Sequence, residues 1–252
     1  MVSNQNQTYE IIEVCLLAGK IMLESGAETG RVEDTMTRIA ASFGINDAHS
    51  YVTPTGIVFS ANGMAPAKLI RISERTTDLR KVTLVNSISR NISGGQVSLQ
   101  EAHQLLEEIK DRNLMFPIWV QIAAASISSG CFLIMFDGLW QDFIPAMIAG
   151  GIGFSCLLYL HYIVQIKFFA EFSASLVIGF LSFLFIQVGI GHELDKIIIG
   201  SVMPLVPGLL ITNAVRDLMS GHLVSGISKG AEAFLTASAI GSGIAVVLSF
   251  FN

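Results

Sequence analysis

The sequence has few cysteines, and its second half has very few charged residues. The three cysteines (Cys15, Cys131 and Cys156) occur at no CxxC or other metal-binding spacing, so we expect buried thiols and no metal site. The N-terminus lacks a basic segment followed by an apolar run, so no cleaved signal peptide is predicted. The sequence also lacks a basic patch, and we therefore expect no nucleic-acid partner.

Charge is distributed unevenly along the 252 residues. Residues 1–115 hold 11 of the 15 Lys and Arg and 13 of the 20 Asp and Glu, so only 4 basic and 7 acidic residues follow. Ordinary soluble domains carry about 25% charged residues, and one with so little charge would not stay dispersed in water. We therefore expect a small α+β domain over residues 1–115 and a membrane domain over residues 116–252.

Five stretches of the second half contain at least 19 residues without Asp, Glu, Lys or Arg. A helix needs about 20 apolar residues to cross about 30 Å of hydrocarbon, and backbone groups in lipid must be paired within the segment. The stretches are Ile118–Phe136, Phe143–Ile166, Phe172–Ile190, Ile197–Val215 and Ala233–Phe251. The predicted fold is a helical membrane bundle of about five transmembrane helices, preceded by the α+β domain.

Lys and Arg near the ends of the spans predict the orientation, because these residues are enriched on the cytoplasmic side. With the N-terminal domain in the cytoplasm, only Lys196 lies outside. The basic residues inside are then Lys110, Arg112, Lys167, Arg216 and Lys229. The sequence thus predicts a multi-pass protein of the cytoplasmic membrane with its C-terminus outside.

The N-terminal domain has the pattern of helices and short strands in the order ααβββαα. Helices are expected at Tyr9–Glu24, Thr29–Phe43, Leu79–Ile92 and Leu99–Arg112, and strands at His49–Thr53, Gly56–Ala61 and Ala67–Ser73. The segment ANGMAP predicts a turn between the last two strands. Ser98 and Glu101 form a capping-box pattern at the start of the fourth helix.

The same domain offers little catalytic chemistry. His49 and His103 have no Cys, Ser or carboxylate at a triad or ligand spacing, so no enzyme activity is predicted. The segment Ser25–Glu28 could contact a ligand, although a turn between two helices explains it equally well. The charged residues Glu28, Arg31, Glu33 and Asp34 are expected to form the solvated face of the second helix.

The fourth span is interrupted near its centre by Pro204, Pro207 and Gly208. Proline has no N–H, so carbonyls one turn earlier lose their helical partners, and glycine adds backbone freedom. Irregular backbone at this depth survives where protein or a wet cavity satisfies it, and broken helices form the substrate sites of many transporters. A proline kink without a ligand is the alternative.

Polar residues follow the interruption on one helical face. Arg216 follows Asn213 by three residues and Thr212 by four, so the three side chains share one helical face. The guanidinium group of an arginine can bind both oxygens of a carboxylate. Alternatively, Arg216 and Asp217 are interfacial charges paired with Glu171 or Glu232. Both of these acids begin spans, where a helix N-terminus favours negative charge, and either could couple transport to protons.

Two segments resemble a known family. LLAGKIMLESGAETGRVEDTMTRIAASFGI at 16–45, followed by YVTPTGIVFS, is similar to the N-terminal domain of the threonine/serine exporter family. MPLVPGLLITNAVRDLMSGHLVSGISKGAEAF at 203–234 resembles that family's most characteristic membrane segment. With the architecture between them, the resemblance extends over essentially the whole chain.

The resemblance implies export of small polar metabolites, driven by the proton gradient and without a cofactor. Full-length members look like two five-span halves in one chain, whereas this sequence resembles the larger subunit of the two-subunit succinate exporters. It therefore implies a small, separately encoded membrane subunit as partner, and a homo-oligomer is a further expectation. Carried over to this chain, the implied substrate-site residues are Pro204, Pro207, Gly208, Asn213, Arg216 and Asp217, with Gly26 and Glu28 as gating or regulatory residues.

A subunit of a secondary exporter of threonine/serine-type amino acids or of a dicarboxylate such as succinate is the leading functional prediction. The alternative from a different class is a membrane-anchored sensor or scaffold whose helices only tether a ligand-binding domain. A mere tether would need no costly break in a membrane helix, which favours the exporter. A membrane-bound hydrolase lacks a nucleophile–base pair.

Overall fold

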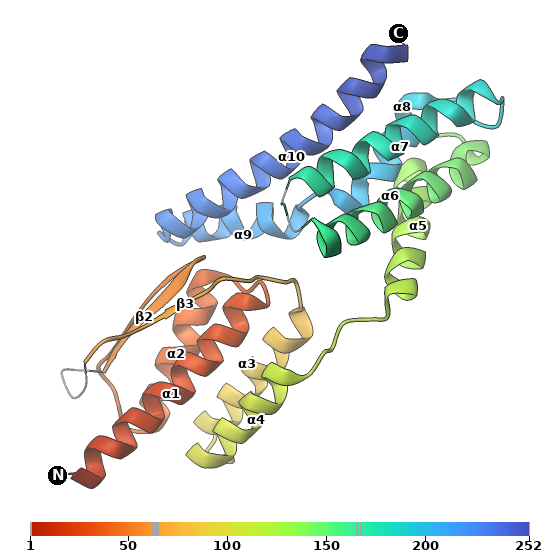
Figure 1. Cartoon of the computed structure of the whole chain (residues 1–252). Helices are drawn as coiled ribbons and strands as arrows, with labels where there is room; N and C mark the ends of the chain where they lie inside the picture. The colour runs from red at the N-terminus through yellow and green to blue at the C-terminus, as the bar shows by residue number, and fades with distance from the viewer. Residues whose placement is uncertain (1, 62–65, 165, 167, 252) are drawn as a thin grey trace. The chain divides into compact units, whose positions relative to one another are not determined.

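The computed structural model describes residues 2–61, 66–164, 166 and 168–251 (Figure 1). Its contacts divide the chain into two compact units. The first unit comprises residues 1–115 and 209–230, and the second comprises residues 116–208 and 231–252. Residues 209–230, which the sequence analysis assigns to the membrane domain, therefore pack with the N-terminal residues.

The N-terminal part of the first unit has four helices and one antiparallel sheet. They are α1 (Val2–Glu24), α2 (Thr29–Ser42), β1 (Ala48–Thr53), β2 (Gly56–Ala61), β3 (Lys68–Arg71), α3 (Leu79–Ser93) and α4 (Leu99–Asp111). The predicted element order is confirmed, and the sheet order is β1-β2-β3. The turn predicted at ANGMAP falls on residues 62–65, which lie outside the described ones.

The core of the first unit centres on the contact between α1 and α2. Ile12 and Cys15 of α1 are buried at the spacing expected for one helical face. The two helices lie close together at Gly19, where a Cβ atom would lie 2.4 Å from the Sδ atom of Met36. Phe59 of β2 is fully buried in the same core. The sheet thus packs on α1 and α2 through its apolar face.

Side-chain caps fix where α3 and α4 begin. Asp78 Oδ1 accepts hydrogen bonds from the backbone N–H groups of Arg80 at 3.1 Å and Lys81 at 3.3 Å. Ser98 Oγ accepts one from the backbone N–H of Glu101 at 3.3 Å. These bonds satisfy donors that have no partner within the first turn of a helix. The predicted N-terminal cap at Ser98 is confirmed.

Four helices are each long and apolar enough to cross a membrane: α5 (Ile118–Met135), α6 (Phe143–Ile163), α7 (Phe169–Gln187) and α10 (Leu223–Phe251). The remaining predicted span consists of two pieces. α8 (Leu194–Val202) continues into the 3-10 turn η2 (Met203–Leu205), and α9 (Gly208–Met219) follows after a bend of 64°. Among the described residues there are thus four spans, or five if the bent pair is one span. The chain is a multi-pass membrane protein.

Small residues let α8 pack closely on α5 and α6 within the second unit. A Cβ atom at Gly200 would lie 2.9 Å from the backbone nitrogen of Leu133 and 2.9 Å from the carbonyl oxygen of Ser129. Ser201 Oγ donates a hydrogen bond to the Ala146 carbonyl at 3.1 Å. Contacts of this kind replace hydrophobic burial as the main attraction between helices in lipid.

The start of α8 is fixed at the C-terminal end of α5. Lys196 Nζ donates to the Phe136 carbonyl at 2.8 Å. The fully buried carboxylate of Asp142 accepts hydrogen bonds from the backbone N–H groups of His192 at 2.8 Å and Glu193 at 2.9 Å. His192 Nδ1 lies 3.1 Å from the same Asp142 Oδ1 atom. Asp142 thus fixes the two residues that directly precede α8 from a distant part of the sequence.

We expect Gly200→Ala to destabilise the purified chain in detergent by about 1–3 kcal/mol, because the added methyl group overpacks against the α5 backbone. Gly241→Ala in α10 is the matched control, since a Cβ atom there meets nothing within 4 Å. The control should be neutral or slightly stabilising, as alanine is the better helix former. Thermal unfolding of both variants measures the difference, and equal effects would contradict the close α5–α8 contact.

Candidate functional site

The turn between α1 and α2 leaves the start of α2 without a cap of its own. Gly26 adopts a positive φ of 86°, which glycine allows at no steric cost. Glu28, at the N-cap position, has extended backbone and its side chain caps no N–H group. The first-turn N–H groups of α2 therefore need partners from elsewhere in the chain.

Asp217 of α9 supplies that cap from 188 residues away in the sequence. Its Oδ1 atom accepts from the backbone N–H of Thr29 at 3.1 Å, and its Oδ2 atom accepts from the Thr29 hydroxyl at 2.8 Å. A negative charge beside a helix N-terminus is also stabilised by the helix dipole. Asp217 is 1% exposed, so these bonds form away from water.

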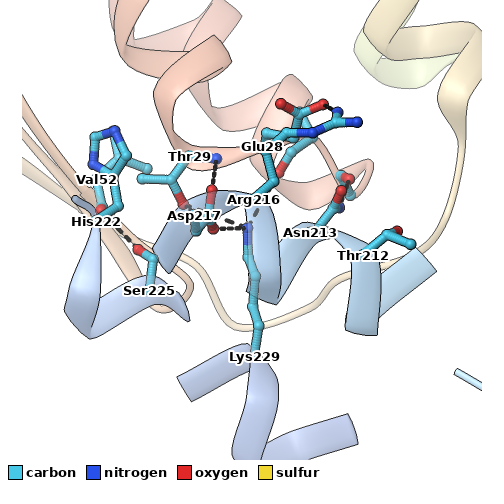
Figure 2. Close-up of polar contacts among 12 residues, drawn as sticks. Glu28, Thr29, Val52, Thr212, Asn213, Arg216, Asp217, His222, Ser225 and Lys229 are labelled. Carbon is cyan, nitrogen blue, oxygen red and sulfur yellow. Dashed lines mark hydrogen bonds and ion pairs between the residues drawn. The ribbon is translucent and has the colours of Figure 1, made fainter. Parts of the chain in front are cut away.

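Lys229 of α10 neutralises this buried carboxylate (Figure 2). Its Nζ atom lies 2.7 Å from Asp217 Oδ2, and the two side chains are only 4% and 2% exposed. The ammonium group also donates to the Thr29 hydroxyl at 3.4 Å and to the Ala27 carbonyl at 3.5 Å. A buried charge pair is tolerated when both groups find such additional partners. The pair therefore joins α9, α10 and the start of α2.

Two further contacts bring the predicted residues of α9 and of the α1–α2 turn together. Asn213 Nδ2 donates to the Gly26 carbonyl at 3.0 Å. Arg216 Nη1 donates to Glu28 Oε1, which also accepts from Arg31 Nη2 at 3.2 Å. The Arg216 side chain is 58% exposed, so this ion pair lies in contact with solvent. Arg216 and Asp217 thus pair with Glu28 and Lys229, and not with the acids Glu171 or Glu232 that the sequence analysis considered.

β1 is an edge strand, and the side chains of Glu33 and Ser225 bind its free backbone groups at Val52. The backbone N–H of Val52 donates to Glu33 Oε1 at 2.9 Å, and its carbonyl accepts from Ser225 Oγ at 3.1 Å. His222 Nδ1 lies 3.7 Å from Glu33 Oε2. Glu33 is therefore half-buried against β1, and the expected solvated face of α2 does not include it. Burial raises the pKa of the Glu33 carboxyl above its ordinary value, opposed by the Val52 N–H and by His222.

α9 is an amphipathic helix whose polar face is the buried one. Asn213 and Asp217 are buried, while Ile211, Val215 and Met219 are exposed on other faces. Thr212 is exposed too, and its hydroxyl donates to the Leu209 carbonyl of its own helix at 3.0 Å. The structure therefore brings Asn213, Arg216 and Asp217 together with the α1–α2 turn and leaves Thr212 outside the cluster.

The predicted interruption of the fourth span is confirmed. Val206 has extended backbone (φ −64°, ψ 129°), which ends the helical path before Pro207. The Val206 N–H donates to the Met203 carbonyl at 3.2 Å, so this carbonyl regains a partner, and the Gly208 N–H donates to the Val206 carbonyl at 2.8 Å. A Cβ atom at Gly208 would meet nothing within 4 Å. Pro204, Pro207 and Gly208 therefore form an open irregular segment.

Besides Asp142, the second unit has a buried carboxylate at the start of α7. Glu171 is 6% exposed, and its Oε1 atom lies 3.5 Å from Nε2 of His161 on α6. Its Oε2 atom is buried and has no hydrogen-bond partner within the part of the chain that the structure describes. Glu232, the other acid predicted for proton coupling, is half-buried on α10.

Sequence reasoning missed four residues of these sites: Thr29, Ser225, Lys229 and His161. Thr29 was expected only as the first residue of α2, because nothing local shows that a distant carboxylate caps it. Lys229 was counted only as a basic residue at the cytoplasmic side. A usable signal existed, since a lone lysine in a long apolar helix needs a partner and Asp217 precedes it closely in the sequence.

Comparison with known proteins decides the family. The family model described as "Putative threonine/serine exporter" matches residues 13–251, nearly the whole chain. The chain belongs to the threonine/serine exporter family. The resemblance stated from two sequence segments is thereby confirmed. No solved structure matches the chain.

Relatives of two kinds match this family member. A protein of Klebsiella aerogenes named "Probable succinate transporter subunit" is 23% identical, with 100% of this chain and 98% of that protein covered. The "Probable threonine/serine exporter" of Mycobacterium tuberculosis is 21% identical over 96% of this chain and 46% of its own length. The "Threonine/serine exporter" of Corynebacterium glutamicum is 20% identical over 96% and 52%. The chain thus spans about half the length of these two exporters.

We expect Lys229→Met to destabilise the first unit by about 3–5 kcal/mol, because it leaves the Asp217 carboxylate buried and unpaired. The double variant Asp217→Asn with Lys229→Met should recover a large part of this loss, since no uncompensated charge remains. Thermal unfolding of the purified chain in detergent measures both. A single variant as stable as the parent would show that the pair does not hold the unit together.

The pKa of Glu33 predicts a pH dependence of stability. The folded protein binds this proton more tightly than the unfolded chain, so stability falls as pH rises from the ordinary pKa of 4.5 through the raised folded value. Glu33→Gln keeps an oxygen acceptor for Val52 but cannot titrate, so its stability should fall less over the same pH range. Unfolding of both proteins between pH 4 and about pH 7 tests this, and parallel profiles would contradict it.

Proposed function

We propose that the chain is a subunit of a secondary membrane exporter of small polar metabolites. The observation that carries the proposal is the irregular segment at Pro204, Pro207 and Gly208 in a member of the threonine/serine exporter family. Broken helices provide unpaired backbone groups and helix ends, which bind polar solutes inside a membrane. The names of the relatives support threonine/serine-type amino acids or a dicarboxylate such as succinate as substrates.

Packing in the second unit supports a break at mid-membrane depth. α8 begins beside Phe136 and packs against Leu133 and Ser129, so it covers the C-terminal half of α5. The turn η2 that follows contacts α5 and α6 further along. Since α5 has 18 residues and rises about 1.5 Å per residue, we propose that η2 lies near the middle of a bilayer that α5 spans. A substrate site here would be reached from both sides.

Arg216 is proposed as the residue that attracts the substrate carboxylate. It already binds one carboxylate, that of Glu28, and more than half of its side chain is exposed. A solute with a carboxylate can take the place of Glu28, whose loop would then act as a gate together with Gly26. Asn213 and Asp217 are engaged with the α1–α2 turn and are proposed to position α9 for this exchange, while Thr212 is free to face the solute.

The proposed orientation places the first unit in the cytoplasm and the C-terminus outside. α5 starts immediately after the N-terminal residues, and the far end of α5 holds Lys196 and the start of α8. Arg216 and Lys229 belong to the first unit, so the bent pair returns to the cytoplasmic side. The chain then crosses the membrane five times, with the broken pair as one crossing.

A small, separately encoded membrane protein is proposed as the partner. The relative from Klebsiella aerogenes, which this chain covers almost completely, is named a transporter subunit. The two relatives that are named exporters, without the word subunit, are about twice as long as the region that matches this chain. A homologous second half would enter the membrane inverted after an odd number of spans, an arrangement common in transporters. The complex can also contain more than one copy of this chain.

Efflux assays with labelled threonine, serine and succinate test the exporter. Cells that express the chain with its partner should export at least one of the three faster than cells that lack both. Arg216→Ala should reduce that efflux by about tenfold or more. Arg31→Ala is the matched control, because Arg31 pairs with the same Glu28 from α2 and should be dispensable. Unchanged efflux with Arg216→Ala would disprove carboxylate binding by Arg216.

The break itself is tested by Pro207→Ala combined with Gly208→Ala. These changes restore an N–H donor and a good helix former, so we expect a continuous helix and a loss of efflux. Gly241→Ala in α10 is the control and should leave efflux intact, because a Cβ atom there meets nothing within 4 Å. Normal efflux by the first variant would show that the irregular segment is not the substrate site.

A further inference from the structure

The carboxylate of Glu171 is buried in a membrane-spanning unit, and one of its oxygen atoms has no hydrogen-bond partner among the described residues. Burying an ionised carboxylate without full hydrogen bonding is costly, and such groups in membrane helices usually have a function. The position in the first turn of α7 offers some compensation, because a helix N-terminus favours negative charge. No donor from the described residues reaches Oε2, so a proton bound to this oxygen would remove the charge where it is least well solvated.

His161 lies on the other side of the same carboxylate. Its Nε2 atom is 3.5 Å from Glu171 Oε1, and 44% of its side chain is exposed, compared with 8% for Glu171. Imidazole exchanges protons at near-neutral pH and has two nitrogens, so it can accept a proton on one side and release it on the other. His161 therefore connects the buried carboxylate with the surface of the second unit.

Few other charged groups surround this pair among the residues that the structure describes. On α6, Tyr159 and Tyr162 are more exposed than His161. On α10, Gly243 packs against Phe172 and Ser175 of α7, and Glu232 is the acidic residue of that helix. The other ionised cluster of the second unit, around Asp142, Glu193 and Lys196, lies at the opposite end of α5 and α6.

We infer that Glu171 and His161 form one proton-binding site, in which Glu171 holds the coupling proton and His161 passes it to and from water. The inference rests on the proposed exporter function and adds its coupling group. When the proton leaves Glu171, the imidazole accepts it at Nε2 and releases a proton to solvent, so charge and atoms balance. Glu171 is chosen over Glu232 because its oxygen is sealed and unpartnered and because a histidine faces it.

Transport in proteoliposomes that contain the chain and its partner subunit tests the inference. With Glu171→Gln, transport driven by a pH gradient should fall at least tenfold, while exchange of labelled for unlabelled substrate without a gradient continues. The amide resembles the protonated acid, so the carrier still moves substrate but carries no proton. His161→Gln should flatten the dependence of exchange on pH between about pH 5 and 8. Glu232→Gln is the matched control and should keep both activities.

Gradient-driven transport at the parental rate with Glu171→Gln would overturn the inference. So would loss of gradient-driven transport, with exchange retained, in Glu232→Gln. Size-exclusion chromatography of each variant identifies any that fails to fold, and Glu171→Asp, which keeps a titratable group, should then restore part of the coupling.

A second measurement does not depend on transport. Dicyclohexylcarbodiimide, an apolar reagent that modifies protonated carboxyl groups, should label Glu171 of the parent protein in membranes, faster at lower pH. Mass spectrometry locates the label, and His161→Gln should change the pH dependence. Labelling of Glu171 in a protein that moves none of the tested substrates would reject the exporter but keep the proton site. Absence of label at Glu171 at low pH would reject the site itself.

Discussion

The carboxylate of Asp217 holds together three helices that are far apart in the sequence. It binds the uncapped start of α2 through Thr29 and takes its counter-charge from Lys229 of α10, with both charges almost fully buried. Neither charge could stay in this interior without the other, because the unpaired charge would remain desolvated. This buried pair is therefore the central contact between residues 209–230 and the N-terminal helices, beside those of Asn213, Arg216 and Ser225.

That attachment gives the irregular segment its significance. Pro204, Pro207 and Gly208 separate α8, which packs on α5 and α6, from α9, whose polar face is buried in the first unit. The exposed ion pair between Arg216 and Glu28 is the weaker part of the contact, since charge pairs in water contribute little.

Family membership and structure answer different parts of the question of function. The family match covers nearly the whole chain and establishes an exporter family, whereas the relatives differ in the substrates that their names give. The structure adds two sites that the names do not contain: the contact of α9 with the α1–α2 turn, and the buried Glu171 beside His161. The first contains residues proposed for the substrate, and the second is the proposed proton site.

The sequence by itself determined the helices of both parts, the spans and the interruption of the fourth one. These features depend on local rules: apolar length, caps such as Ser98, and the missing N–H groups of Pro204 and Pro207. It also pointed to Asn213, Arg216 and Asp217, but as residues facing a solute. Only the tertiary structure decided that Asn213 and Asp217 bind the α1–α2 turn, that Lys229 is buried, and that His161 meets Glu171. Such partners lie up to 202 residues apart, and their pairing follows from burial and distance in the folded chain, which no periodicity in the sequence records.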